Sequence, residues 1–199
     1  METERERVRE FFAAKAVGWE KRFPDDEPAY AAAVAELALR PGQSALDAGC
    51  GTGRALPQLR AAVGPAGVVI GADLTPEMLD EATVLGRHRA GALIEADSAR
   101  LPLRDGCLDA VFAAGLLHHL SDAAAGLREF ARVTRPGGRL ALFHPIGRAA
   151  LAARRGHTLR EDDVRAKPNL PRLLTAAGWE LTLYDDAEHR YLAVATRVG

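Results

Sequence analysis

The nine residues Ala45-Leu46-Asp47-Ala48-Gly49-Cys50-Gly51-Thr52-Gly53 decide the fold of this chain. They form a short apolar run that ends in a carboxylate and continues into three glycines at alternate positions. This order predicts the end of a buried strand, a tight loop and the start of a helix, because glycine lets the backbone turn sharply and approach a ligand closely. The loop is therefore the first place to look for a ligand site.

A dinucleotide site is one interpretation of this loop. In the pattern Gly-x-Gly-x-x-Gly, the glycines let the backbone approach a pyrophosphate at a helix N-terminus. Counted from Gly49, the third glycine would fall at Arg54, and Asp47 would place a carboxylate beside a diphosphate. A ligand without phosphates that carries a sulfonium and an amino group would instead be attracted by Asp47.

Length and composition predict a single domain without a nucleic-acid partner. A chain of 199 residues can bury roughly 70% of its unfolded surface. Its formal net charge of −1 gives no electrostatic reason to bind DNA or RNA. The two cysteines, Cys50 and Cys107, have neither zinc spacing nor a disulfide pattern, so free thiols and no metal are expected. No apolar run reaches the roughly 18 residues of a membrane span, which predicts a soluble, cytoplasmic monomer or homodimer.

Strands and helices alternate from Pro41 onward. The expected strands are residues 44–47, 68–73, 92–97, 108–113 and 139–144, and the helices between them cover 54–63, 75–85 and 121–134, the last with Ser121 as its N-cap. Continuous apolar strands separated by helices predict an α/β fold with a mostly parallel sheet and helices on both faces. Ligands of such sheets bind beyond the carboxyl ends of the strands, where this chain places Asp47, Asp73, Asp97, Ala114-Gly115 and His144.

The flanking segments are expected to complete this core. Residues 1–40 form an N-terminal helical cap with helices at 3–16 and about 27–39. This cap either only completes the core or also closes over a ligand with Trp19 and Tyr30. Residues 146–168 show no clear strand and form a variable segment on the substrate side. Residues 169–199 form a closing helix and a hairpin, whose antiparallel strands cover one edge of the sheet.

Five segments, taken in order, resemble class I S-adenosylmethionine (SAM) dependent methyltransferases. They are Asp47 to Gly53, Ala-Asp-Leu-Thr-Pro-Glu-Met-Leu at 72–79, Glu-Ala-Asp-Ser at 95–98, Leu-Leu-His-His-Leu at 116–120 and Arg-Pro-Gly-Gly-Arg-Leu at 135–140. The set is similar to the small-molecule methyltransferases of ubiquinone and menaquinone biosynthesis. This resemblance implies one Rossmann-like domain over residues 1–199, with a seven-stranded, mostly parallel sheet, one antiparallel edge strand and a SAM-binding core at 41–145. It also implies direct displacement at the methyl carbon, with S-adenosylhomocysteine (SAH) as product.

The same resemblance assigns the cofactor to residues that follow the first four strands: Asp47, Gly49, Cys50, Gly51, Gly53, Asp73, Leu74, Met78, Asp97, Ser98 and Gly115. Asp47 would hold the methionine end, Asp73 the ribose hydroxyls and Asp97 the adenine amino group, for which carboxylates are suitable acceptors. An acid about 20 residues beyond the glycines also binds the ribose of NAD, so Asp73 alone does not distinguish the two cofactors. Each assignment has a simpler structural alternative, because a strand-end aspartate often caps a turn and Met78 fits a helix core.

The acceptor is not specified by these motifs. A small organic molecule is expected, in a pocket lined by Phe12, Trp19, Tyr30, His119 and residues 146–168. His118 and His144 are candidates for a general base, although the paired histidines can equally be a structural turn. Two further functions stay open besides methyl transfer: a non-catalytic SAM-binding regulator or partner subunit, and an NAD(P)-binding oxidoreductase.

Overall fold

The computed structural model describes residues 3–22 and 26–199, whereas residues 1–2 and 23–25 of the expected N-terminal cap lie outside the described part. The strands are β1 (Ser44–Ala48), β2 (Val68–Asp73), β3 (Ala92–Glu95), β4 (Leu108–Ala114), β5 (Thr134–His144), β6 (Trp179–Ala187) and β7 (Arg190–Arg197). The helices are α1 (Glu4–Ala13), α2 (Glu27–Ala35), α3 (Leu56–Val63), α4 (Pro76–Val84), α5 (Ala123–Val133), α6 (Arg148–Arg154) and α7 (Leu170–Ala176). Three short 3-10 turns join them: η1 (Glu20–Arg22), η2 (Arg87–Arg89) and η3 (Leu117–His119).

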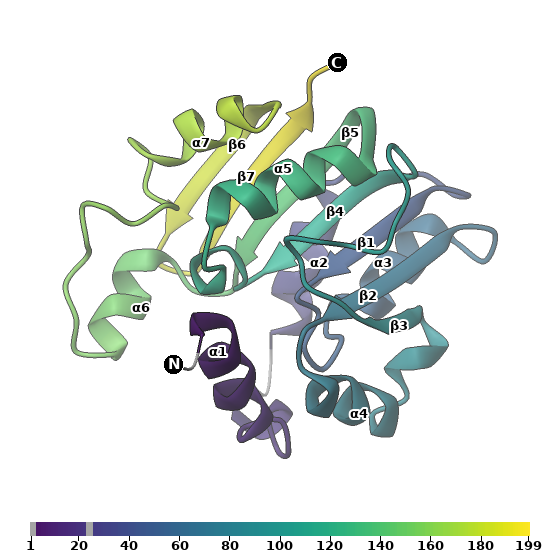
Figure 1. The fold of residues 1–199 in the computed structure, drawn as a ribbon, viewed down its shortest axis with the longest axis horizontal. Coiled ribbons are helices and arrows are strands. Elements are labelled where there is room, and N and C mark those ends of the chain that lie inside the picture. The colour runs from purple at the N-terminus through teal and green to yellow at the C-terminus, as the bar shows by residue number, and fades with distance from the viewer. Residues whose placement is uncertain (1–2, 23–25) are drawn as a thin grey trace.

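The strands form one sheet in the order β3-β2-β1-β4-β5-β7-β6 (Figure 1). Strands β1 to β5 pair in parallel, whereas β7 runs antiparallel to both β5 and β6. The expected seven-stranded, mostly parallel sheet with antiparallel pairing at one edge is confirmed. The chain changes direction along the sheet between β1 and β4, and ligands of open α/β sheets bind at such a point.

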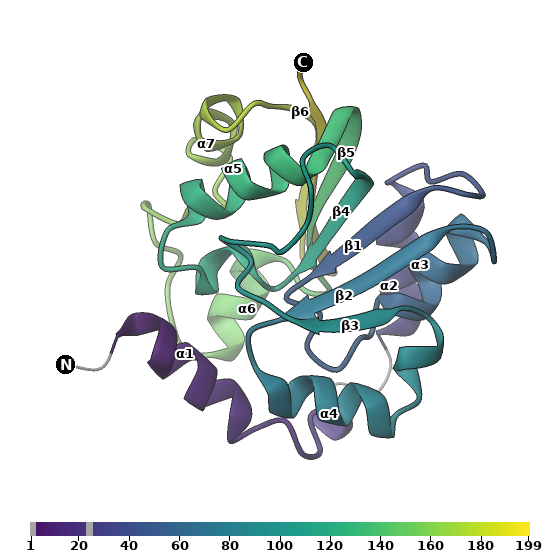
Figure 2. The same cartoon turned by 45° about the vertical axis from the view of Figure 1, so that its right-hand side comes forward.

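Both faces of the sheet are covered by helices. On one face, Ala45 and Phe112 pack with residues of α2 and α3. On the other, Leu46 and Val111 pack with residues of α5 and α7, and Figure 2 shows these helix pairs on opposite sides of the strands. Burial on both sides explains why β1 and β4 are continuous apolar runs in the sequence.

Helices α1 and α6 lie beside one end of the sheet rather than over a face (Figures 1 and 2). Helix α1 reaches the loops beyond the carboxyl ends of the strands. Its Arg5 lies 3.3 Å from the Asp97 carboxylate, and its Phe12 ring stacks edge-on against His119, 5.1 Å between centroids. In the described part of the chain, no helix has the length and apolarity to cross a bilayer.

Residues 146–168 contain no strand, in agreement with the sequence analysis, and they include one helix that it did not predict, α6. Helix α6 buries none of its residues. Without a buried stripe there is no hydrophobic period for sequence analysis to detect. The periodicity of apolar residues that predicts the other helices therefore does not predict this one.

Several expected boundaries also shift. Helix α2 ends at Ala35 rather than near residue 39, and Ala38 follows in a left-handed conformation with φ of 48°, which no regular helix accommodates. Strand β3 ends at Glu95 instead of 97. The N-cap of α5 is Asp122, not Ser121, because the Asp122 carboxylate accepts from the backbone N–H of Ala125 at 2.9 Å.

Candidate active site

A cavity of about 240 Å³ opens beyond the carboxyl ends of β1, β2 and β4. It is bounded by α1 and α2 on one side and by the loops after β3 and β5 on the other. Every site residue that the sequence analysis named individually lines it except Gly53, and of the expected segment 146–168 it is lined by Ile146, Leu151 and Arg155. The fold therefore brings together residues from position 12 to position 144, although their ligand roles stay predictions.

The glycine loop after β1 forms the floor of this cavity. Gly49 and Gly51 have φ of 64° and 53°, a conformation that favours glycine. A Cβ at Gly49 would lie 2.7 Å from the Leu116 side chain, so this position also needs the missing side chain for space. Gly53 turns away from the cavity and packs on α3, where a Cβ would lie 2.8 Å from Leu56.

Asp73 ties two loops together at the end of β2. One carboxylate oxygen accepts from the Gly51 N–H at 2.8 Å, and the other accepts from the Thr75 N–H at 2.8 Å. Burial raises the pKa of Asp73, and these backbone hydrogen bonds partly offset the shift. Each oxygen keeps a further lone pair, so the carboxylate can still accept from a ligand.

Asp47 is the most buried carboxylate of the site, with 2% of its surface exposed. No hydrogen-bond donor reaches its side chain from residues 3–22 or 26–199. Burial, and then the charge of Asp73, raise the pKa of Asp47 well above its usual range. A buried carboxylate without a partner is costly, so the two aspartates form a site where a cationic group would be stabilised.

Asp97 lies at the far end of the cavity, in the loop after β3. One oxygen accepts from the Ala99 N–H at 2.9 Å, and the other faces Arg5 of α1 at 3.3 Å. The sequence indicated an aspartate here but not its partner on a helix more than 80 positions away. Leu74 and Met78 also line the cavity, and Met78 is 2% exposed, so both interpretations of Met78, core and cavity wall, hold.

Three histidines line the opposite wall of the cavity. The rings of His118 and His119 lie 4.0 Å apart. Burial lowers the pKa of His118 to about 2 and that of His119 to about 4, with smaller contributions from nearby cationic groups including Arg155 and Arg165. Burial also lowers the pKa of His144, whose Nδ1 lies 2.8 Å from the carbonyl oxygen of Ile146. All three imidazoles are therefore neutral at pH 7.

The aromatic residues of the N-terminal cap occupy the cavity mouth. Phe12 packs edge-on against Trp19, 5.8 Å between centroids. Tyr30 lies 5.1 Å from the ring of Phe143 in the core and lines the cavity as well. The cap thus completes the core and also closes one side of the cavity.

Some lining residues were missed by sequence analysis. Thr52 is buried and donates its hydroxyl to Glu20 at 2.5 Å, and its position inside the glycine loop was the available signal. Arg155, directly after α6, carries no signal because the helix itself is not apparent in the sequence. Among the described residues, no group of three or more His, Cys, Asp or Glu side chains is placed to hold a metal ion.

A second cavity of about 700 Å³ adjoins the first between η3, α6 and residues 157–165. The residues shared by both cavities are His118, Leu120, Leu151 and Arg155. The second, larger cavity therefore lies next to the first on its histidine side, beside α6.

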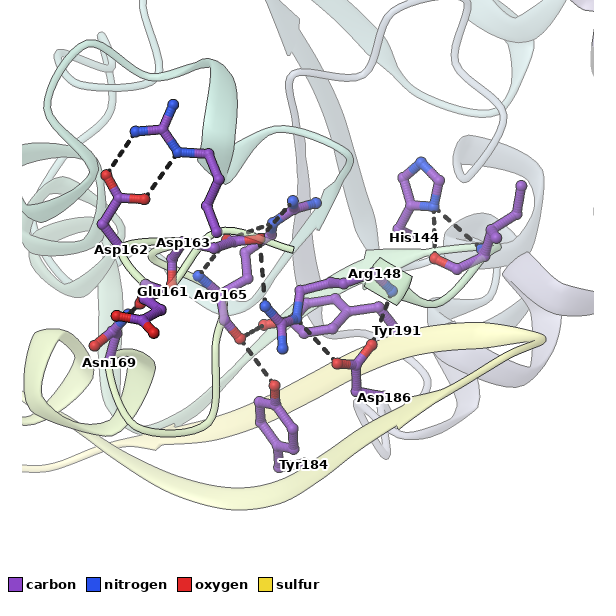
Figure 3. Close-up of polar contacts among 12 residues, drawn as sticks. His144, Arg148, Glu161, Asp162, Asp163, Arg165, Asn169, Tyr184, Asp186 and Tyr191 are labelled. Atoms are coloured by element: carbon purple, nitrogen blue, oxygen red, sulfur yellow. Dashed lines mark hydrogen bonds and ion pairs between the residues drawn. The ribbon is translucent and has the colours of Figure 1, made fainter. Parts of the chain in front are cut away.

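A network of ion pairs joins the segment that lines this second cavity, residues 148–165, to the β6–β7 hairpin (Figure 3). The Arg148 guanidinium lies 3.0 Å from Asp186 and 3.3 Å from Asp163. Arg165 pairs with the same Asp163 at 2.9 Å. The hydroxyl groups of Tyr184 and Tyr191 both donate to the backbone carbonyl oxygen of Arg165, at 3.0 and 3.2 Å.

Methyltransferases are among the known proteins that this chain resembles. A methyltransferase domain profile matches residues 46–142, the stretch from β1 to β5. The demethylmenaquinone methyltransferase of Beutenbergia cavernae is 31% identical over 194 aligned residues, which cover 80% of this chain and 78% of that protein. A SAM-dependent methyltransferase from Aquifex aeolicus has the same fold, with a TM-score of 0.74, 23% identity and coverage of 94% of this chain and 98% of that structure.

Other curated relatives match over a shorter part of their length. An uncharacterised 37.1 kDa protein of transposon TN4556 from Streptomyces fradiae is 44% identical over 110 residues, which are 55% of this chain and 32% of that protein. Three such relatives are covered over only 32 to 43% of their own length. The alignment with the Beutenbergia cavernae enzyme spans most of both chains, and by it the chain belongs to the class I SAM-dependent methyltransferase family.

Proposed function

We propose that this chain binds SAM in the first cavity and transfers its methyl group to a small-molecule acceptor that enters from the histidine side. The observation that carries the proposal is the pair of carboxylates at the glycine loop, the buried Asp47 and the half-buried Asp73. This pair suits a cationic amino acid moiety next to a ribose and disfavours a diphosphate.

The chemistry of the lining residues fits SAM in three parts. Asp47 has no donor of its own among the described residues and would pair with the ammonium group. Asp73 is positioned by Gly51 and Thr75 and has lone pairs left for two ribose hydroxyls. Asp97 would accept from the adenine amino group, with the apolar surface of Met78 along the ring.

SAM supplies an electrophilic methyl group on a sulfonium sulfur, so the protein needs to align donor and acceptor. Alignment of two reactants in a near-attack geometry is worth up to roughly 7 to 11 kcal/mol. In this chain the glycine loop holds one side of the cavity floor. Leu116, packed against Gly49, and Phe12 also line the cavity and restrict the space in it.

Of the two histidine candidates for a general base, His144 is the better placed. The pKa of His118 at about 2 makes it a weak base, and its Nδ1 is buried without a hydrogen-bond partner among the described residues. In the tautomer in which the His144 Nδ1–H donates to the carbonyl oxygen of Ile146 at 2.8 Å, Nε2 carries no proton and can take one from the acceptor. We therefore favour His144 for an acceptor whose hydroxyl, amine or thiol must lose a proton.

Calorimetry with the purified chain tests the cofactor assignment. SAM or SAH should bind with a micromolar Kd, about −8 kcal/mol, and NAD should bind far more weakly. NAD binding as tight as SAM binding would overturn the proposal in favour of an oxidoreductase.

A screen of candidate acceptors tests turnover. Release of SAH should accompany methylation of at least one small molecule and should depend on His144 if proton removal is needed. SAM binding without SAH release for any acceptor would favour the non-catalytic alternative, a SAM-binding regulator or partner subunit.

A further inference from the structure

Charges are divided between the two sides of the site. The carboxylates that line the first cavity are Asp26, Asp47, Asp73 and Asp97, on the loop side. The second cavity, on the histidine side, is lined by four arginines and two aspartates among the described residues. The cofactor side is therefore acidic, and the side that would receive the acceptor is basic.

Most of these arginines already have partners. Arg148 and Arg165 share Asp163, and Arg160 pairs with Asp162 at 2.7 Å on the surface. Arg155 differs, because its guanidinium has no hydrogen bond or ion pair with any side chain or backbone group that the structure describes. It is also the one arginine that lines both cavities among the residues that the structure describes.

Arg165 has donor capacity left over. Its Nε and Nη2 contact Asp163 at 3.0 and 2.9 Å, whereas its Nη1 is buried and has no partner in the described part of the chain. A buried donor without an acceptor is destabilising, so it marks a place where a ligand or ordered water would complete the hydrogen bonding. Arg155 and Arg165 thus leave unused N–H groups around the same cavity.

We propose that the methyl acceptor carries an anionic oxygen group, a carboxylate or a phosphate, that binds Arg155 where the two cavities meet. This inference rests on the proposed function, since it names the class of substrate for the same site. A guanidinium is suited to this role because its planar N–H groups match two oxygens of a carboxylate or phosphate at once. The remainder of the acceptor would extend past His118 toward the glycine loop.

The positive charge on this wall also affects the pKa of the histidines. After burial, the charges of Arg155 and Arg165 are among the causes that lower the pKa of His119 and His144. A bound anion would neutralise part of this charge and make His144 more basic. An anionic acceptor would therefore bind and also improve the base that faces it.

The test compares acids with uncharged analogues of the same shape on the SAH-loaded full chain. The probes are aromatic and aliphatic hydroxycarboxylates, each with its primary amide, and phosphate monoesters, each with its parent alcohol. Binding is measured by calorimetry on the parent and on R155Q, R155K and R154Q. Arg154, the last residue of α6, is the matched control, because it is exposed like its neighbour Arg155 but lines neither cavity.

At least one acid should bind about tenfold more tightly than its uncharged partner, and R155Q should remove that preference. R155K should retain part of it and R154Q all of it. The carboxylate and phosphate series decide which anion the site prefers. If no acid binds better than its partner, or if R155Q behaves like R154Q, the inference is overturned. SAH binding to the same preparations keeps this failure separate from failure of the proposed function, which would abolish SAH binding itself.

Discussion

Replacement of Asp73 by alanine is the sharpest test of the cofactor site. The substitution removes the acceptor of two backbone hydrogen bonds, from Gly51 and from Thr75, each 2.8 Å long. It would also remove the acceptor of both ribose hydroxyls. The two losses are separable, because the first exists without ligand and the second only with it.

The magnitudes follow from the hydrogen bonds. Hydrogen bonds to charged groups contribute about 1.5 to 3 kcal/mol each, so two ribose hydroxyls correspond to about 3 to 6 kcal/mol, or roughly 10²- to 10⁴-fold in Kd. Without ligand, water can reach the freed N–H groups, because the Asp73 site is only partly buried. The ligand-free protein should therefore lose only about 1 to 3 kcal/mol of stability.

Titration calorimetry with SAH measures the first quantity, and urea unfolding of the ligand-free protein measures the second. D80A is the matched control, since Asp80 is exposed on α4 and should leave both quantities unchanged. In addition, SAH at 100 times its parent Kd should stabilise the parent by about 2.7 kcal/mol and D73A hardly at all. A folded D73A that binds SAH within about threefold of the parent would refute the assignment of Asp73.

Three further predictions concern single side chains. D97N should weaken SAH binding by about tenfold, less than D73A, because one contact to a base is weakened rather than two removed; equal losses in calorimetry would contradict this. His118 has a pKa of about 2 in the folded protein against 6.5 normally, so the unfolded chain binds the extra proton and stability falls as pH drops below 6.5. Between pH 7 and 5 this lowers the free energy of unfolding of the parent by about 2 kcal/mol. In urea unfolding, the decrease over the same pH interval should be smaller in H118N than in the parent by about this amount. An equal decrease in both proteins would exclude the effect. H144Q should slow turnover at saturating SAM by about 10²-fold or more. The parent rate should fall in acid with an apparent pKa below the ordinary histidine value, because burial lowers the pKa of His144; an unchanged rate in H144Q would mean that alignment alone carries the reaction.

The cofactor half of the site could be predicted from sequence because its signals are local. Asp47 and Asp73 each end an apolar run that is buried on both faces, and the rule that parallel strands end at one edge then places them together. Because each aspartate stands at the end of its strand, the sequence alone predicts that the two lie close together. The same logic placed Asp97 and Gly115 at the cavity.

The acceptor half could not be predicted because its signals are long-range. Helix α6 buries no residue, so nothing in its sequence distinguishes it from a loop. The Arg5 contact with Asp97 and the position of Arg155 between two cavities depend on tertiary packing. Even the cap of α5 was ambiguous, because Ser121 and Asp122 are both good N-cap residues and only the Asp122 hydrogen bond separates them.

Residues 148–165 contact the β6–β7 hairpin near both of their ends, so the residues between these contacts could be replaced by those of a related protein. Arg148 fixes one end on Asp186, and the carbonyl group of Arg165 fixes the other end on Tyr184 and Tyr191. Between these points, none of residues 149–162 is buried, so length and sequence can vary there at little cost to stability as long as Asp163, which pairs with both Arg148 and Arg165, is kept. A chimera that keeps the two anchor points and takes the intervening residues from a relative would transplant acceptor preference while SAM affinity stays with β1 and β2.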